Sequence, residues 1–343
     1  MVFFCSLYLR MQRTYSFIIP VFNRPQEILE LLDSFSKLIS HIAFEIVIIE
    51  DGSTLKSDKI ALGFKNKLNI SYFFKSNSGP GDSRNFGMQK ATGNYFIILD
   101  SDCLLPPEYL MEVDKSLTNH FLDCFGGPDA AHSSFTPLQK AINYTMTSFL
   151  TTGGIRGSNK TVQQFEPRSF NMGISKKAFQ KSGGFGKIHP GEDPDLSQRL
   201  LKLGFQTGFI EKAFVYHKRR ISWSTFYNQV KKFGLVRPIL SKWHPESSKI
   251  SFWFPSLFVV YVCLSIVSLF MGIWISMISL GLYTLAIVLD SSIKNKSLWI
   301  GILSSCAVFI QFFGYGLAFI KSTFFIHLLN ENPKKCFPQL FFD

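Results

Sequence analysis

The most restrictive feature of the sequence is a long run without charge in its last third. Residues 252–289 include no Asp, Glu, Lys or Arg, and residues 297–320 form a second uncharged run. A helix needs about 20 apolar residues to cross the hydrocarbon layer of a membrane. The first run is long enough for two membrane-spanning helices joined by a tight turn near Met271, and the second for one. We therefore expect an integral membrane protein with about three transmembrane helices over 252–330 and a tail over 331–343.

The composition agrees with a folded membrane protein. Of the 343 residues, 46% are hydrophobic and 17% are charged, below the ~25% charge of ordinary soluble domains. This excludes a disordered tail protein, a collagen-like chain and a small disulfide-rich secreted protein. The six cysteines form no CxxC motif and no zinc-type Cys/His pair, so we expect reduced thiols. We expect residues 1–13 to be an N-terminal extension and not a cleaved export signal. We expect the charged part of the chain that precedes the apolar runs to face the cytoplasm, on the inner (plasma) membrane.

A basic and aromatic segment stands before the apolar runs. Residues 212–249 contain nine Lys or Arg and one acid, with Phe, Tyr and Trp interleaved. Such a segment suits the anionic surface of the cytoplasmic leaflet, and we assign residues 221–251 to the membrane interface. Nucleic-acid binding is the competing interpretation of a basic patch. No nucleic-acid motif accompanies it, so we expect no nucleic-acid partner.

The first 125 residues alternate short apolar runs with polar, helix-like stretches. This alternation predicts an α/β fold with a mostly parallel, Rossmann-like sheet covered on both faces. We expect strands at Tyr15–Val21, Phe44–Ile49, Ile70–Phe74 and Tyr95–Leu99, and helices at Pro25–Leu38 and Ser83–Ala91. In such sheets, ligands bind at the carboxyl ends of the strands. The polar residues that follow three strands, at Asn23, Glu50–Ser53 and Asp100–Asp102, are therefore the first candidates for function.

Asp100-Ser101-Asp102 directly follows the apolar run YFIIL. Two carboxylates at the end of a strand can offer two hard oxygen ligands to one divalent cation. Mg²⁺ or Mn²⁺ held in this way commonly takes its other ligands from substrate phosphates. The pattern predicts a metal and phosphate site, with an ordinary Asx-type turn as the alternative.

Asp51-Gly52-Ser53 ends the second apolar run. An aspartic-protease loop requires the order Asp-Thr/Ser-Gly, which differs from the order found here. Gly52 would let the chain turn away while Asp51 faces the crevice, so a contact with a base and ribose is the better interpretation. A simple turn is the alternative.

Three segments, YSFIIPVFNRPQEILELLDSF, FEIVIIEDGS and SGPGDSRNFGMQKATGNYFIILDSD, together resemble the family 2 glycosyltransferases of GT-A fold. The resemblance is close over residues 14–125, the expected nucleotide-sugar-binding half, and looser to about residue 240. It implies that a nucleotide sugar binds at the sheet edge with Mg²⁺ or Mn²⁺. The implied donor residues are Pro20, Val21, Asn23, Asp51 and Ser53 around the base and ribose, Arg84 and Asn85 near uracil and the first phosphate, and Asp100 near the sugar or ribose. The implied metal ligand is Asp102, with Asp100 and His217 as further candidates.

Residues 126–220 are expected to form the acceptor-binding half. Gly183-Gly184-Phe185 is followed by Glu192-Asp193, as in the same family, and the resemblance implies that Asp193 is the catalytic base. An inverting transfer needs a carboxylate to take the acceptor hydroxyl's proton, which contributes roughly 10²–10⁴-fold. Glu192 would orient the acceptor, and Asp195 is most simply a charge at a helix N-terminus. Helix capping alone is the alternative for the pair.

His217 and the cluster Lys218-Arg219-Arg220 follow, and then Gln229-Val230-Lys231-Lys232-Phe233. The latter is similar to the Gln-x-x-Arg-Trp element of membrane-bound synthases, with Lys and Phe replacing Arg and Trp. Lys is a point charge without the bidentate fork of Arg. His217 or Lys232 would contact the donor diphosphate in one interpretation. In the other, which the sequence favours equally, His217 is structural and Lys232 belongs to a basic helix that faces the membrane.

Taken together, these features predict a membrane-anchored, metal-dependent, inverting glycosyltransferase, similar to succinoglycan-type bacterial enzymes. It would move a sugar from a nucleotide-diphosphate donor, UDP-linked in the family's commonest case, to a lipid-linked or membrane-proximal glycan acceptor in polysaccharide or surface-glycan biosynthesis. A processive synthase is disfavoured because only about three spans follow the domain. A nucleotidyltransferase would have a glycine- and arginine-rich first loop, and a non-catalytic glycan-binding scaffold would need neither Asp102 nor Asp193.

The apolar runs carry no charge in their interiors, which predicts an anchor rather than an ion pathway. With a cytoplasmic catalytic domain, the loop at Lys294 and Lys296 is also cytoplasmic. A third span would place the C-terminus outside, which Lys334 and Lys335 oppose. A re-entrant third segment is the alternative.

Overall fold

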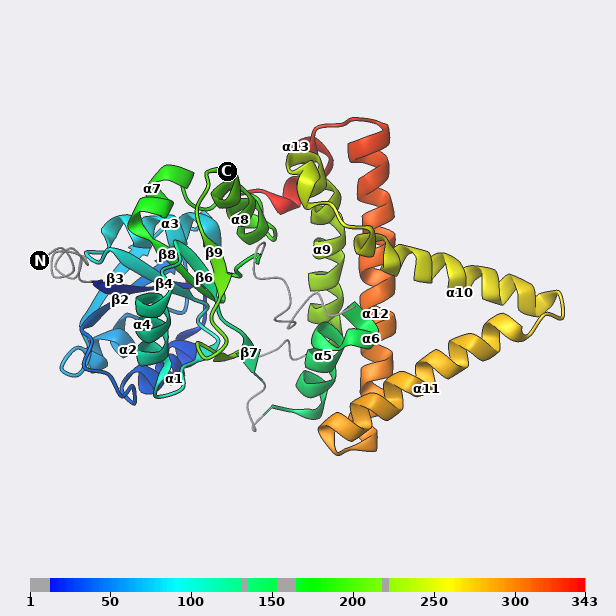
Figure 1. Ribbon diagram of the computed structural model, residues 1–343, viewed down its shortest axis with the longest axis horizontal. Helices are drawn as coiled ribbons and strands as arrows, with labels where there is room; N and C mark the ends of the chain where they lie inside the picture. Colours follow the sequence, from blue (N-terminus) through cyan, green and yellow to red (C-terminus); the bar gives the residue numbers. More distant parts are fainter. Residues whose placement is uncertain (1–12, 131–134, 153–164, 218–221, 343) are drawn as a thin grey trace, which may run out of the picture. The chain divides into compact units, whose positions relative to one another are not determined.

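The computed structural model describes residues 13–130, 135–152, 165–217 and 222–342 (Figure 1). The chain divides into two compact units. The first comprises residues 1–129, 163–186 and 199–215, and the second comprises 130–162, 187–198 and 216–343. The N-terminal extension over residues 1–12 and the basic cluster Lys218-Arg219-Arg220 lie outside the described residues.

The first unit is built on a seven-stranded sheet. Its strands, in spatial order, are β3 (Ile70–Lys75), β2 (Phe44–Asp51), β1 (Tyr15–Val21), β4 (Tyr95–Leu99), β8 (Asn171–Ser175), β6 (Cys124–Gly126) and β9 (Thr207–Phe209). All pairings are parallel except those of β8, which runs antiparallel to β4 and to β6. The mostly parallel sheet predicted from the sequence is confirmed.

The four predicted strands are present, and two of them are longer than expected. β2 continues to Asp51 because β3 continues beside it to Lys75, and the two residues are partners in the parallel register. This extension keeps Glu50 and Asp51 within the sheet. The polar end of β2 is therefore a rigid edge and not a free loop.

Helices flank the strands of this sheet, and those of the first unit are α1 (Pro25–Phe35), α2 (Asp58–Phe64), α3 (Pro80–Lys90), α4 (Tyr109–Asn119) and α7 (Lys176–Ser182). α1 ends before the predicted Leu38, because Leu38 N–H bonds to the carbonyl three residues back and tightens the chain into a turn. α3 begins before the predicted Ser83. Pro80 occupies its first position, where a missing N–H costs nothing, and the preceding Gly79 has φ 92°.

The core of the first unit lies between the sheet and its helices. Phe17, Ile19 and Ile48 are fully buried, and they pack with Ile28 of α1 and Val113 of α4. Burial of such a side chain contributes about 1.5–3 kcal/mol, so this layer fixes the register of the central strands. The central strands then hold their carboxyl ends at one edge of the sheet.

A second, smaller sheet consists of β5 (Cys103–Leu104), β10 (Val215–His217) and β7 (Asp129–Ala130), in the order β5-β10-β7. The division between the two units falls within β10. Because β5 follows Asp102 directly, this sheet brings the end of β10 next to the Asp100–Asp102 turn.

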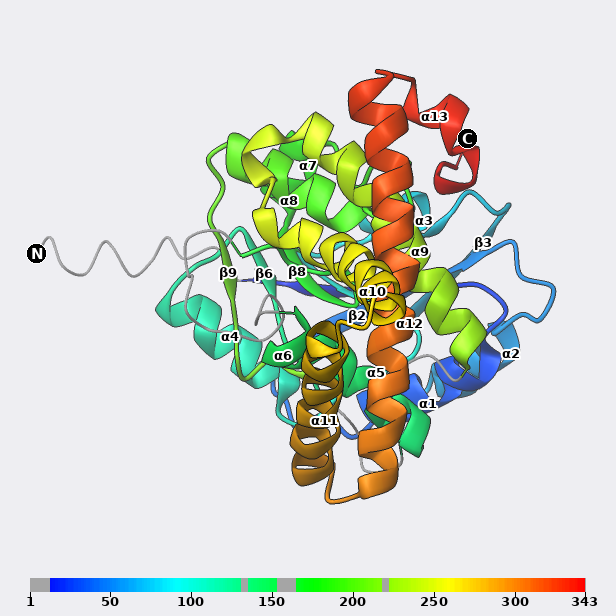
Figure 2. The same cartoon turned by 90° about the vertical axis from the view of Figure 1, so that its right-hand side faces the viewer.

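The second unit is helical. Its helices are α5 (Pro137–Thr147), α6 (Phe149–Thr152), the first turns of α8 (Glu192–Lys202), α9 (Trp223–Trp243), α10 (Phe254–Phe270), α11 (Ile275–Asn295), α12 (Leu298–Thr323) and α13 (Pro333–Cys336). α9 and α12 lie side by side in both views (Figure 1, Figure 2).

Three helical segments of the second unit are long and apolar enough to cross a membrane: Ile250–Phe270, Ile275–Asn295 and Leu298–Leu328. The prediction of about three such helices is confirmed. The turn expected near Met271 also forms, since α10 ends at Phe270 and α11 begins at Ile275, with Gly272 at φ 77°. The five cysteines among the described residues are free thiols, as expected.

Candidate active site

The residues that follow β1, β2 and β4 lie along one edge of the sheet, which we call the donor edge. β1 pairs in parallel with both β2 and β4, so the carboxyl ends of all three strands point the same way. Asn23 after β1, Asp51 at the last position of β2 and Asp100 after β4 therefore lie along a single edge. The sequence predicted this juxtaposition, and the topology confirms it.

Asp51 organises the loop between β3 and α3. Its side chain is buried, and its two oxygens accept hydrogen bonds from the backbone N–H groups of Ser78 and Gly79, both at 3.0 Å, and from Lys75 Nζ at 2.9 Å. Gly52 is required beside it, because a Cβ there would lie 2.6 Å from Asn77 N and φ is 74°. The carboxylate thus fixes the chain that leads into α3.

Glu50, to which the sequence analysis gave no role beyond its place in the polar end Glu50–Ser53, is fully buried at the same edge. Its carboxylate accepts hydrogen bonds from Ser53 Oγ, from Ser57 N and Oγ at 2.8 Å each, and from Tyr72 Oη at 3.1 Å. Burial, followed by the charge of Glu50, raises the pKa of the Tyr72 phenol. The signal in the sequence was an acid that directly follows the apolar run Ile46–Ile49.

Asn23 ties the end of β1 to the loop after β2. It has φ 55°, its N–H donates to Ser53 Oγ at 2.7 Å, and its side-chain oxygen accepts from Thr54 N at 2.8 Å and Leu55 N at 2.9 Å. Asn tolerates this left-handed conformation better than most residues. Val21 beside it is buried, so only its main chain faces the edge.

Arg84 and Asn85 of α3 connect the donor edge to the Gly-Gly-Phe segment. Arg84 donates to Asp100 Oδ1 at 2.9 Å, and its guanidinium, which is almost fully buried, lies 5.3 Å from the centre of the Phe185 ring. The Asn85 amide donates to Phe185 O at 2.9 Å and accepts from Phe185 N at 2.8 Å. Asn85 therefore holds a backbone segment, while Arg84 neutralises the first carboxylate of Asp100-Ser101-Asp102.

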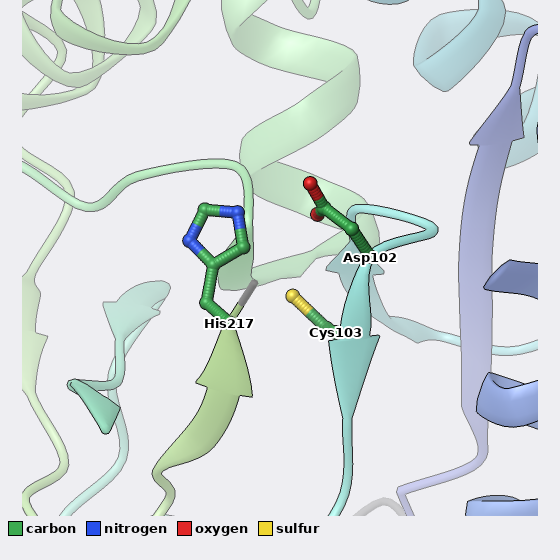
Figure 3. A group of neighbouring side chains, drawn as sticks. All are labelled: Asp102, Cys103 and His217. Carbon is green, nitrogen blue, oxygen red and sulfur yellow. The ribbon is translucent and has the colours of Figure 1, made fainter. Parts of the chain in front are cut away.

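Asp102, Cys103 and His217 form a group of three potential metal ligands, with one ligand atom from each within 4.8 Å of the others (Figure 3). Asp102 lies in the turn before β5, and His217 ends β10. The Cys103 thiol donates to Phe170 O at 3.3 Å, and burial raises its pKa well above the usual range. It is therefore a neutral thiol, and Asp102 and His217 provide the useful donors.

This donor set fits a divalent cation. Carboxylate oxygen is the preferred ligand of Mg²⁺ and Mn²⁺, and imidazole nitrogen also suits Mn²⁺. The sequence analysis named Asp102 and His217 as candidate metal ligands but not Cys103. The residue pattern itself does not show how Asp102 and His217, which are 115 positions apart, come close together. The three-stranded sheet supplies that connection.

In the second unit, the first turn of α8 carries Glu192, Asp193 and Asp195. Glu192 is buried and its Oε1 lies 2.9 Å from His189 Nδ1. Asp195 is also buried, and its Oδ1 lies 2.9 Å from His244 Nε2. Asp195 lies in the first turn of α8, as expected of a charge at a helix N-terminus, and a buried histidine from beyond α9 holds it in addition. Asp193 lies between two anchored acids.

Lys232 lies on α9, and its side chain is exposed. Pro20 is half-buried at the end of β1. The roles of these residues and of the other implied donor and acceptor residues remain predictions.

A mostly parallel α/β sheet with acids at its carboxyl edge is the architecture of GT-A glycosyltransferases. A mannosyltransferase from Pyrobaculum calidifontis, solved with GDP-Man and Mn²⁺, has the same fold, with a TM-score of 0.50 and 13% identity over 96% of this chain and 83% of that one. Residues 16–183 match the model of the family described as Glycosyl transferase family 2. Residues 16–183 thus correspond to a family 2 glycosyltransferase domain.

Curated relatives agree over the same region. An uncharacterized glycosyltransferase of Rickettsia bellii is 39% identical over 89 residues, 26% of this chain and 13% of that protein. The poly(ribitol-phosphate) beta-N-acetylglucosaminyltransferase TarS of Staphylococcus aureus is 32% identical over 112 residues, 32% of this chain and 20% of that protein. The chain therefore matches no more than a fifth of the length of these relatives.

Proposed function

We propose that the protein is a membrane-anchored, inverting glycosyltransferase. It transfers a sugar from a nucleotide-diphosphate sugar to a lipid-linked or membrane-proximal glycan, and the donor we propose is a UDP-sugar. The observation that carries this proposal is the donor edge of a family 2 domain, where Asp51, Asp100 and Asp102 follow strands of one sheet. The name of the Staphylococcus aureus relative, which gives poly(ribitol-phosphate) as its substrate, supports a glycan or related polymer as the acceptor class.

The donor's base and ribose would bind against Pro20, the Val21 main chain, Asn23, Asp51 and Ser53. The hydrogen bonds that fix Asn23 and Asp51 to their loops support this role, because a pre-formed pocket loses less entropy on binding. Arg84 and Asn85 would lie near the first phosphate, with Asp100 near the sugar or ribose. Lys232 remains a candidate contact for the diphosphate.

Asp102 and His217 would hold a Mg²⁺ or Mn²⁺ ion, with Asp100 as a further candidate ligand. Their mutual proximity and their hard oxygen and nitrogen donors support this assignment. Bound there, the cation would offset the negative charge that develops on the departing diphosphate. Arg84 would orient Asp100 through its 2.9 Å hydrogen bond.

Asp193 would act as the general base. Its carboxylate would take the proton of the acceptor hydroxyl as that oxygen attacks the anomeric carbon opposite the leaving diphosphate. Such help contributes roughly 10²–10⁴-fold. Glu192 would orient the acceptor, and its bond to His189 supports a fixed position for it. The three apolar helical segments would anchor the enzyme, with the catalytic domain in the cytoplasm.

The proposal is tested by titrating the detergent-purified protein with UDP, GDP and dTDP, with and without Mn²⁺, by calorimetry. We expect Mn²⁺-dependent binding of one nucleoside diphosphate, UDP first. A folded protein that binds none of them would contradict the transferase and favour a glycan-binding scaffold. Binding of GDP or dTDP alone would correct the donor and leave the reaction class in place.

A further inference from the structure

The last residues of the chain are paired with the segment that leads into α8. His189 N–H donates to Leu340 O at 2.7 Å, and Phe342 N–H donates to Lys187 O at 3.0 Å, so that Ile188 and Phe341 form an antiparallel bridge. Leu340 is fully buried in a cluster with Ile188 and Phe337. The C-terminal tail (Phe337–Phe342) therefore lies on the same side of any membrane as Glu192 and Asp193.

The start of the apolar region lies on that side as well. His244, just after α9, bonds to Asp195 of α8 in a buried contact at 2.9 Å. The chain thus enters the apolar helices from the side of α8 and ends on the side of α8. A chain that begins and ends on one side of a bilayer crosses it an even number of times. Three crossings are incompatible with these contacts.

α12 differs from the other two apolar segments in its surroundings. In the most apolar stretch of the segment that contains α12, 50% of the residues are buried within the protein. The corresponding share is 22% in the segment that contains α10 and 11% in α11. α12 packs along α9, and the two helices run in the same direction (Figure 1). The contacts run from Gly314 with Val230, through Ser322 Oγ with Leu235 O at 2.6 Å, to the π-helical turn after α12, where Ile326 O accepts from Lys242 Nζ at 3.1 Å.

The charges of α9 determine how deep α9 and α12 lie in the membrane. α9 carries Lys231, Lys232, Arg237 and Lys242 along its length. Helices with charges spaced in this way do not cross the hydrocarbon layer, but they do lie at its surface. Because α12 follows α9 over most of its length, it lies at the same depth.

The beginning of α12 meets polar groups too. Just before it, Asp290 near the end of α11 accepts a hydrogen bond from Tyr144 Oη of α5 at 2.6 Å and pairs with Lys294 at 2.8 Å. Ser291 and Ser304 bond to each other at 2.7 Å. Both ends of α12 are therefore joined to helices or segments that lie outside the hydrocarbon.

The hairpin of α10 and α11 has the opposite character. Around its turn, Phe270 is 87% exposed, Ile275 75%, Met271 71% and Trp274 64%. The distal half of the hairpin stands apart from the other helices of the second unit (Figure 1). Apolar exposure on this scale, in a run without charge, fits acyl chains as the surrounding medium.

We propose that only the α10–α11 hairpin enters the bilayer and returns, while α12 lies at the membrane surface beside α9 and brings the C-terminus back to the side of α8. This inference rests on the proposed membrane anchoring. It resolves the topology that the sequence left open, since both Lys334 and Lys335 then lie on the catalytic side.

The first test locates the tail. In full-length chains whose native cysteines are replaced, Lys335→Cys and Lys37→Cys each provide one exposed thiol, the latter just after α1 as a matched catalytic-domain control. A membrane-impermeant maleimide is applied to inside-out and right-side-out vesicles, and permeabilised vesicles give the full labelling. We expect both positions to label in the same vesicle orientation. Labelling of the two positions from opposite sides would overturn the inference.

The second test measures depth with two native cysteines. Cys263 near the middle of α10 and Cys306 of α12 are both exposed. Each is kept as the single cysteine, labelled with a fluorophore, and placed in vesicles of phosphatidylethanolamine and phosphatidylglycerol with shallow or deep lipid quenchers. We expect deep quenching at Cys263 and shallow quenching at Cys306. Equally deep quenching would overturn the surface position of α12.

Two outcomes distinguish a failure of this inference from a failure of the proposed membrane anchoring. If neither fluorophore is quenched and alkaline carbonate releases the protein from membranes, the anchoring itself fails, and the inference falls with it. If the protein resists carbonate but Lys335→Cys labels from the side opposite Lys37→Cys, the anchoring stands and the inference alone fails.

Discussion

The acids of the donor edge and the acids of α8 are held in place by different means. Asp51 is fixed by two backbone N–H groups and a lysine that lie within 28 residues of it. Asp195 is fixed by His244, 49 residues away, and the loop before α8 is fixed by the last residues of the chain. The donor edge is thus a product of local turns, whereas the geometry around Asp193 depends on distant parts of the second unit.

This difference separates binding from turnover. Changes at the donor edge should weaken binding of the nucleotide, while changes around α8 should spare that binding and slow transfer. Each of the following variants changes either the donor edge or the residues that hold α8 in place. They are given in order from the largest expected effect to the smallest.

Asp102→Ala should abolish the Mn²⁺-dependent part of nucleotide binding. Loss of a residue that only hydrogen-bonds to a metal ligand lowers metal affinity roughly 10–100-fold. Loss of a ligand itself should therefore weaken Mn²⁺-dependent binding by more than about 100-fold. Calorimetry with Mn²⁺ and with EDTA measures this effect. Asp58→Ala, an exposed acid on α2, is the matched control and should bind normally. Full Mn²⁺-dependent binding by Asp102→Ala would remove Asp102 from the metal site.

Leu340→Ala should destabilise the second unit and slow transfer without weakening nucleotide binding. Leu340 is fully buried, and such truncations cost about 2–5 kcal/mol in the free energy of unfolding. Thermal unfolding in detergent, beside a transfer assay, measures both effects. The neighbouring exposed Gln339→Ala should change stability by less than about 0.5 kcal/mol. Unchanged turnover in Leu340→Ala would show that the tail is not needed to hold α8.

His244→Ala should lower stability by about 1–3 kcal/mol, because it leaves the buried Asp195 carboxylate without its histidine. Transfer should fall while nucleotide affinity stays constant. The double variant Asp195→Ala/His244→Ala should be less destabilised than the sum of the two single variants, since the two residues act as a pair. Strict additivity would mean that the contact contributes nothing specific.

Lys75→Ala should have the smallest effect. It removes one of the hydrogen bonds to Asp51 and leaves those from Ser78 and Gly79. A loss near 1 kcal/mol corresponds to about fivefold in nucleotide affinity, with transfer at saturating donor unchanged. A drop of more than 100-fold would indicate that Lys75 touches the donor itself.

The same difference explains how much of the fold and site could be predicted. Runs such as Tyr15–Val21 and Tyr95–Leu99 are apolar enough to define buried strands, and parallel pairing then puts Asp51 and Asp100 at one edge. The order of strands and acids along the chain was therefore sufficient to predict the donor edge. The buried hydrogen-bonding role of Glu50 could not be predicted because its three partners come from two separate segments.

The region around α8 could not be predicted to the same extent. Nothing in the sequence connects Asp195 with His244 or Ile188 with Phe341, because these contacts form only after α9 and the apolar helices have packed. The apolar runs likewise predicted three candidate spans correctly. Their lengths could not reveal that α12 packs along α9, since that depends on small residues such as Gly234 and Gly314, where helices approach closely.

The most direct test of the central claim compares nucleotide binding and turnover in Asp193→Asn. The asparagine keeps the size of the side chain and removes its ability to take a proton. Turnover is followed as release of the nucleoside diphosphate from the identified donor sugar in the presence of membrane lipid acceptors. The account predicts unchanged donor affinity with turnover reduced roughly 10²–10⁴-fold. Normal turnover in Asp193→Asn would contradict the assignment of the base on α8.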